Sequence, residues 1–112
     1  MVKYNNEMLN DVFHVLSDPT RREMIRRLAL GEMTVMKLAE PFEMTLPAIS
    51  KHLRVLEKAG LVSVRKEGTY RYYVLNPKTM DNAHAWLMDV RKFWTTQLDN
   101  LDQFLDQQSE DH

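Results

Sequence analysis

The chain has 112 residues, 44% hydrophobic and 28% charged, with only 3 Gly and 4 Pro, a composition typical of one helix-rich globular domain over residues 1–112. It contains no cysteine, which excludes disulfides, thiolate metal sites and cysteine nucleophiles. The formal net charge is -1, but residues 1–78 carry 13 Lys and Arg against 9 Asp and Glu, whereas residues 79–112 carry 2 against 7. A basic body followed by an acidic segment is compatible with a polyanionic partner on one face.

Membrane proteins and enzymes are not expected from this sequence. No apolar run approaches the roughly 18 residues of a membrane-spanning helix, and the N-terminal residues lack the apolar core of a signal peptide. No Gly-rich phosphate loop, Ser/His/Asp grouping or pair of carboxylates appears at compatible positions. We therefore expect a cytoplasmic protein without a membrane partner, a cofactor or a catalytic site.

Three short helices are predicted in the first part of the chain. Apolar residues recur at helical spacing over residues 7–16, which predicts the first helix. Asp18 followed by a proline is typical of a helix N-terminus, and the second helix is expected to run from there up to Gly31. Thr34 is expected to cap a third helix that ends near residues 39–42.

A fourth helix and a β-hairpin are predicted next. Thr45 is expected to cap the helix and Gly60 to end it. The spacing of apolar residues then changes from about 3.6 to 2, which predicts a hairpin with its turn at residues 67–69 and a second strand over residues 70–75. The fold class is therefore mainly α with a small β-hairpin wing, a winged helix-turn-helix. The side chains of the fourth helix predicted to point inward are Leu46, Ile49, Leu53 and Leu56.

The outward side of the fourth helix is a candidate DNA-binding surface. Small and hydrogen-bonding residues gather in its N-terminal half, which suits entry into a major groove about 12 Å wide. Residues 45–75 hold six Lys and Arg against two Asp and Glu, a charge that fits phosphate contacts on both sides of one groove. The predicted DNA-binding residues are Thr45, Pro47, Ala48, Ser50, Lys51, His52 (at the boundary of this face) and Arg54 on the helix, and Arg65, Lys66, Thr69 and Arg71 on the hairpin.

Three stretches, residues 17–22, 46–62 and 65–73, together resemble the ArsR family of bacterial transcriptional repressors, and the resemblance extends over about residues 7–108. It implies a homodimeric winged-helix protein that binds operator DNA and often loses affinity when an effector binds. It also implies DNA contacts by Ser50, Lys51, His52 and Arg54 in the recognition helix and by Arg65, Lys66 and Arg71 in the wing.

Metal sensing, which the resemblance makes worth testing, is not expected. The third helix offers no thiolate, and Asp81, His84 and Asp89 in the last helix lack the later pair of histidines that the family's dimer-interface zinc site uses. We therefore expect no metal site, and any small-molecule effector is unknown. A cavity for an organic effector between the first and last helices remains an alternative, since the eight methionines suit an adaptable pocket as well as a core.

The last helix, predicted over residues 78–108 and followed by disorder at residues 109–112, is expected to form a dimer. A helix of about 30 residues reaches roughly 45 Å, more than a core of this size can cover. Pairing through the first and last helices would place two recognition helices about 34–36 Å apart, one turn of B-DNA. The predicted dimer-interface residues are Met8, Leu9, Val12, Leu87, Val90, Trp94, Leu98, Leu101 and Leu105.

Two other interpretations stay open at this point. A winged helix used for protein–protein contact is the main alternative, because a fold alone does not fix a function. Tyr70, Tyr72 and Tyr73 would suit base stacking on a single strand, but tyrosines alternating along a strand more often pack in the core and at edges.

Overall fold

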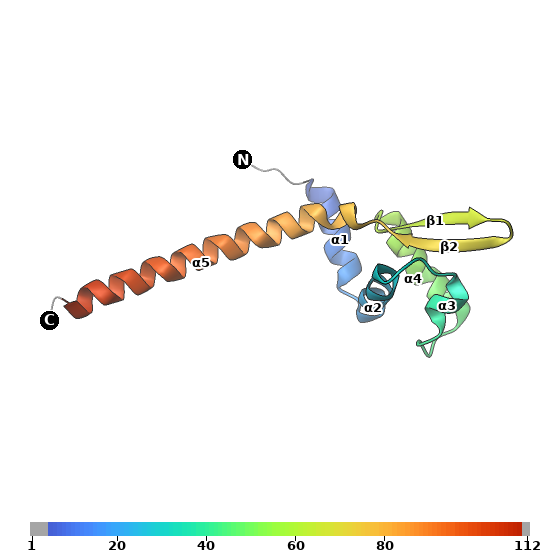
Figure 1. The fold of residues 1–112 in the computed structure, drawn as a ribbon, viewed down its shortest axis with the longest axis horizontal. Coiled ribbons are helices and arrows are strands. Elements are labelled where there is room, and N and C mark those ends of the chain that lie inside the picture. Colours follow the sequence, from blue (N-terminus) through green and yellow to red (C-terminus); the bar gives the residue numbers. More distant parts are fainter. Residues whose placement is uncertain (1–4, 111–112) are drawn as a thin grey trace.

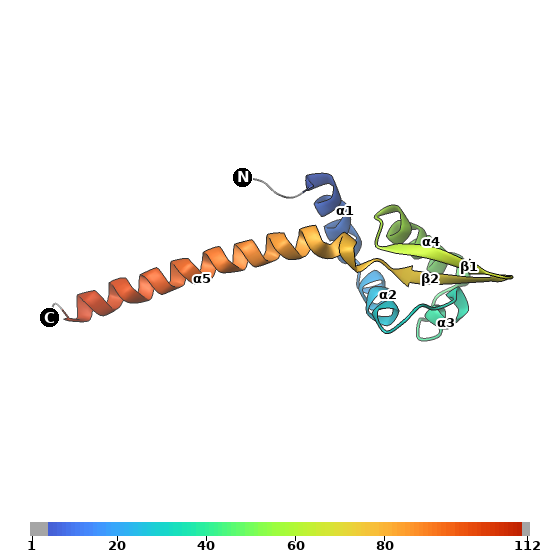
Figure 2. The same cartoon turned by 45° about the horizontal axis from the view of Figure 1, so that its top comes forward.

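The computed structural model describes residues 5–110, with side chains through residue 108. Helices α1 to α4 and a β-hairpin form one body, and the last helix projects from it, so that the molecule measures 75 × 32 × 20 Å (Figure 1, Figure 2). This is the predicted winged helix-turn-helix. The elements are α1 (Asn6–Leu16), α2 (Pro19–Ala29), α3 (Val35–Ala39), α4 (Leu46–Lys58), β1 (Val62–Glu67), β2 (Tyr70–Leu75), the short 3₁₀ helix η1 (Pro77–Met80) and α5 (Asp81–Glu110).

Four helices begin at a side-chain cap. The Asp18 carboxylate accepts a hydrogen bond from the backbone N–H of Arg21 at 3.0 Å, and the proline after Asp18 occupies the first turn of α2. Each of the other caps also accepts a hydrogen bond from the backbone N–H three residues further on: Asn5 from Met8, Thr34 from Lys37 and Thr45 from Ala48. The predicted caps of α2, α3 and α4 are therefore confirmed.

The core lies where α1, α2, α3 and α4 meet β1. Ile49, Leu53 and Leu56 of α4 are buried as predicted, whereas Leu46 is 44% exposed, and its predicted inward position is wrong. Leu46 occupies the first turn of α4, and Phe42, just before the helix, packs against the core instead. The other buried side chains are Leu9, Val12, Val15, Met24, Ile25, Leu28, Leu38, Leu61, Val62 and Ala83.

The hairpin pairs β1 with β2 in antiparallel register, from Val62 opposite Leu75 to Glu67 opposite Tyr70. Glu67 therefore belongs to the strand, and the turn itself is Gly68 and Thr69, where Gly68 adopts a φ of +60° that favours glycine. The outer edge of β2 pairs with a single residue before α3. Met33 and Tyr73 exchange two backbone hydrogen bonds of 3.1 and 2.7 Å.

Helix α5 begins and ends later than expected. The predicted helix from residue 78 is a 3₁₀ turn over residues 77–80 followed by the α-helix, which runs to Glu110. Residues 109 and 110, expected to be disordered, are thus helical, and residues 111–112 lie outside the described residues. The Thr79 hydroxyl of η1 donates to the Gly60 carbonyl at 2.6 Å. This hydrogen bond connects the turn before α5 to the segment that follows α4.

Substituting the cap of α2 tests the contribution of that helix end. Asp18→Ala is expected to lower the free energy of unfolding by about 1 kcal/mol, the usual cost of losing an N-cap, whereas Asp18→Asn keeps a capping oxygen and should lose much less. Urea unfolding at one fixed protein concentration measures both variants. Equal stability of the two would contradict the capping role.

The charge of Asp18 adds a pH dependence. Hydrogen bonding from the Arg21 backbone N–H, with the nearby charges of Arg21 and His52, holds the pKa of Asp18 below its usual 3.8. A carboxyl with a lowered folded pKa contributes stability above its unfolded pKa and loses that contribution as the pH falls through the folded value. The stability difference between the wild type and Asp18→Asn should therefore shrink below about pH 4.

Candidate nucleic-acid interface

Helix α4 presents a polar face opposite its buried one. Ile49, Leu53 and Leu56 are at most 1% exposed, which fixes the rotation of the helix about its axis. Lys51 and Arg54 consequently point to solvent. Of the other residues predicted for DNA contact on this helix, Thr45 and Pro47 are exposed, and Ala48, Ser50 and His52 are partly buried.

His52 faces the protein more than the solvent. Its Nδ1 atom lies 3.4 Å from a guanidinium nitrogen of Arg21 and 3.9 Å from the Asp18 carboxylate, and its side chain is 20% exposed. The Arg21 guanidinium also donates to the backbone carbonyls of His14 and Val15 at the end of α1. These contacts connect α4 to the junction of α1 and α2. This linkage could not be predicted from the sequence, because the partners of His52 lie more than 30 positions away.

The wing carries the other predicted DNA-binding residues, and their surroundings differ. Lys66, Thr69 and Arg71 are exposed near the tip, and among residues 5–108 no ion pair includes Lys66 or Arg71. Arg65 is also exposed, but its guanidinium donates to the carboxylates of Glu32 and Glu67.

The tyrosines of β2 are occupied by packing. The Arg65 guanidinium lies over the ring of Tyr72, with its central carbon 4.6 Å from the ring centroid. Tyr73 packs against the core, and its backbone pairs with that of Met33. Tyr70 is 61% exposed, with its ring centroid 6.3 Å from that of Tyr72. These contacts favour packing over base stacking.

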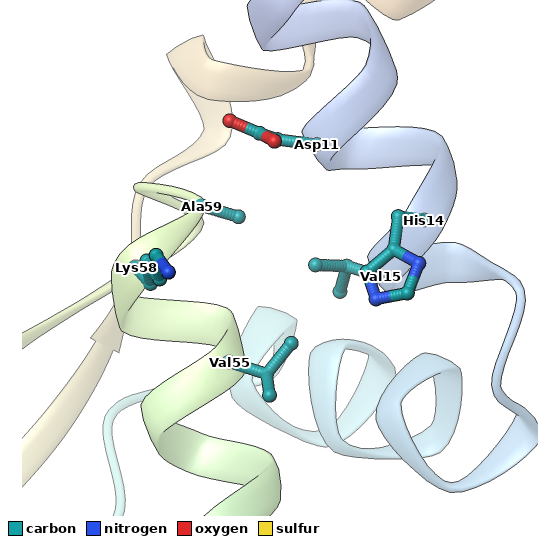
Figure 3. A pocket seen from close by; sticks show the side chains of 6 residues that line it. All are labelled: Asp11, His14, Val15, Val55, Lys58 and Ala59. Atoms are coloured by element: carbon teal, nitrogen blue, oxygen red, sulfur yellow. The ribbon is translucent and has the colours of Figure 1, made fainter.

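A hollow of about 300 Å³ lies between α1 and α4 (Figure 3). Its apolar walls are formed by Val15, Val55 and Ala59, and its polar residues, Asp11, His14 and Lys58, are all exposed. Small-molecule sites usually fix their ligand with a few polar groups in a largely enclosed pocket, which this hollow lacks. It also differs in place from the cavity considered between the first and last helices.

Exposed apolar side chains run along α5 from Trp86 to Leu105. Among the side chains described, only Ala83 of α5 is buried, while Trp94 is 61% and Leu101 is 51% exposed. The ring of Trp86 packs edge-on against Phe13 of α1, with centroids 5.8 Å apart, and both rings remain more than a third exposed. The exposed large apolar side chains of α5 are Trp86, Leu87, Met88, Phe93, Trp94, Leu98, Leu101, Phe104 and Leu105.

Two predicted dimer-interface residues of α1 lie in the chain's own core. Leu9 is 7% and Val12 is 1% exposed, because both pack in the chain's own core and leave little surface for a partner. Met8 remains 38% exposed, and Phe13, which the sequence analysis did not include, offers an exposed ring on the same helix. Apolar spacing alone could not separate these roles, since a core and a dimer interface both favour apolar residues.

Metal and membrane sites were also sought in the described part of the chain. Within residues 5–108, no three or more His, Cys, Asp or Glu side chains come together in a group that could hold a metal ion. Among the residues that the structure describes, no helix combines the length and the hydropathy of a membrane span.

Comparison with known proteins gives consistent matches. Residues 18–64 match the family model described as bacterial regulatory protein, arsR family. The chain is 37% identical over 81 residues to the transcriptional repressor SdpR of Bacillus subtilis (strain 168), an alignment that covers 72% of this chain and 90% of that protein.

Two solved structures are also similar to this chain. A crystal structure of an ArsR family transcriptional regulator superposes with a TM-score of 0.76 at 38% identity, covering 85% of this chain and 97% of that one. A homodimeric winged helix-turn-helix DNA-binding domain from Mycobacterium bovis, described as a possible ArsR-family regulator, gives a TM-score of 0.63 at 26% identity, covering 82% and 91%.

Proposed function

Because the chain belongs to the ArsR family of DNA-binding transcriptional regulators, we propose that it is a homodimeric repressor that binds a palindromic operator. Helix α4 of each protomer enters a major groove, and the wing lies on the flanking backbone or minor groove. The observation that carries this proposal is the division of α4 into a face buried through Ile49, Leu53 and Leu56 and an outward polar, cationic face. Such a regulator works in the cytoplasm, where the DNA is.

Different side chains serve different parts of this recognition. Lys51 and Arg54 are long, exposed donors suited to guanine edges or phosphates, and Ser50 is a shorter partner beside them. Thr45, Pro47 and Ala48 are small residues at the N-terminal end of α4, where they lie beside the exposed Leu46 and suit approach to the groove. On the wing, Lys66, Thr69 and Arg71 supply backbone contacts.

Two substitutions on α4 test the reading role. Lys51→Ala or Arg54→Ala is expected to weaken binding to the operator by about 1–3 kcal/mol, with a smaller effect on random duplex. Lys58→Ala is the matched control, because it removes a lysine from the far end of the same helix. The measurement is a salt-titrated binding assay with a duplex footprinted in the promoter region of its own gene.

The same assay decides between the two functions. If the wild-type protein bound no duplex even at low salt, DNA recognition would be wrong, and the protein–protein module would be favoured. If Lys51→Ala and Arg54→Ala affected operator and random duplex alike, α4 would not read the sequence.

The dimer is proposed from the exposed apolar surface of α5. A monomer would leave that surface in water over most of a 30-residue helix. The charges favour an antiparallel pairing of two α5 helices. The half nearer the body is neutral, since Arg91 and Lys92 are balanced by Asp81 and Asp89, whereas the distal half carries the acidic residues Asp99, Asp102 and Asp106. An antiparallel partner therefore keeps the two acidic halves apart.

A single charge placed in this surface tests the dimer. Trp94→Glu is expected to convert a dimer into a monomer in sedimentation velocity and to weaken operator binding about tenfold or more, because a buried unpaired carboxylate opposes association. Thr95→Glu adds the same charge one position away from the seven-residue apolar repeat and should leave the dimer intact. A wild-type monomer, or identical behaviour of the two variants, would contradict the proposed interface.

We also propose that operator binding needs no metal and no cofactor. The chain has no thiolate to offer, and its histidines and carboxylates are not gathered into a ligand set within the described residues. Zn²⁺ at ten micromolar or EDTA at one millimolar should each change the operator affinity by less than about twofold. A larger, saturable change on adding Zn²⁺ would mean that a metal regulates this protein.

A further inference from the structure

Arg65 lies across the hairpin rather than out from it. Its side chain starts on β1, passes over the ring of Tyr72 on β2, and reaches Glu32 on the segment that pairs with the far edge of β2. The Nε atom donates to a Glu32 oxygen at 3.0 Å, and an Nη2–H donates to the other oxygen of the same carboxylate. Nη1 donates to Glu67 at 2.7 Å. One guanidinium thus joins three segments of the chain.

The alternation of side chains along β1 separates Arg65 from the other cations of the wing. Lys66 and its cross-strand partner Arg71 lie on the same face of the hairpin as Val62, which is buried against the helices. Arg65 lies on the opposite face, together with Tyr72. A duplex placed against α4 and the wing would therefore meet Lys66 and Arg71 on a different face from Arg65.

The positive charge of Arg65 is more than balanced by its neighbours. Two carboxylates surround one guanidinium, so the group of Glu32, Arg65 and Glu67 carries a net negative charge. Hydrogen bonding from Arg65 lowers the pKa of Glu32 below its usual 4.5. A bidentate pair with a carboxylate is geometrically specific, and a phosphate would have to displace it to bind Arg65.

We propose that Arg65 is a positioning residue: it holds the wing against the segment before α3 through Glu32, and it does not contact phosphate. The proposal rests on the proposed DNA-binding function and revises the contact expected for Arg65. Lys66 and Arg71 then supply the phosphate contacts of the wing, at an orientation that Arg65 and Glu32 set.

The salt dependence of DNA binding tests this division of roles. Arg65→Ala, Arg65→Lys and Glu32→Gln are each expected to weaken operator binding about three- to tenfold with an unchanged slope of log affinity against log salt. Lysine keeps the charge but lacks the fork that pairs with both oxygens of Glu32, so it should not rescue. Lys66→Ala or Arg71→Ala should flatten the slope by about 0.9 per lost contact, and hence by about 1.8 in a dimer.

The opposite pattern would overturn the proposal. If Arg65 contacts phosphate, then Arg65→Ala flattens the slope, Arg65→Lys restores it, and Glu32→Gln tightens binding by releasing a cation. The double variant Arg65→Ala/Glu32→Gln adds a second criterion. Its operator affinity should equal that of either single variant if Arg65 and Glu32 act as one unit. Losses of affinity that add up in the double variant would contradict such a unit.

A measurement without DNA separates failure of this inference from failure of the proposed function. Amide hydrogen exchange in β1 and β2 of the free protein should be about tenfold faster in Arg65→Lys and Glu32→Gln, and unchanged in Lys66→Ala. Unchanged exchange in the first two variants would refute the positioning role, whatever the protein binds. Faster exchange in a protein that binds no duplex would refute DNA recognition and leave the positioning role standing.

Discussion

The burial of one side of α4 is the constraint on which the rest of this molecule depends. Ile49, Leu53 and Leu56 meet Leu38 of α3 and Met24 of α2 in one core, and all five side chains are at most 1% exposed. With 3.6 residues per turn, holding these positions inward determines the direction of every other side chain on the helix. The buried side chains alone therefore orient the polar face of α4 toward solvent. The apolar core thus decides which chemical groups the helix offers to a ligand.

Local signals in the sequence were sufficient for most of the fold. The caps at Asp18, Thr34 and Thr45 and the change of spacing after Gly60 depend on residues a few positions apart, which a single sequence displays directly. The same reasoning could not distinguish two environments that favour the same local pattern. Leu9 and Val12 fit both a core and a dimer surface, and only the packing of α1 against the body assigns them to the core.

The surroundings of the candidate contacts could not be predicted, because they depend on residues far apart in the chain. Arg65 and Glu32 are separated by 33 positions, and Arg21 and His52 by 31. A sequence shows that a side chain is basic or has an imidazole ring, but not which carboxylate faces it after folding. Counting positive charges therefore overstates the number available to a polyanion, since part of that charge is used within the fold.

The attachment of α5 has a mechanical consequence. Among the side chains described, Ala83 is the only one of this helix that is buried, and about 27 residues, or roughly 40 Å of helix, extend beyond it. Because α5 is attached only near its N-terminal end, a small rotation there is amplified along the helix. A tilt of about ten degrees at that end moves the far end by roughly 7 Å. In a dimer joined along α5, the packing where the helix leaves the body, around Ala83 and the Phe13–Trp86 contact, would set the separation of the two α4 helices and with it the half-site spacing that the dimer can span.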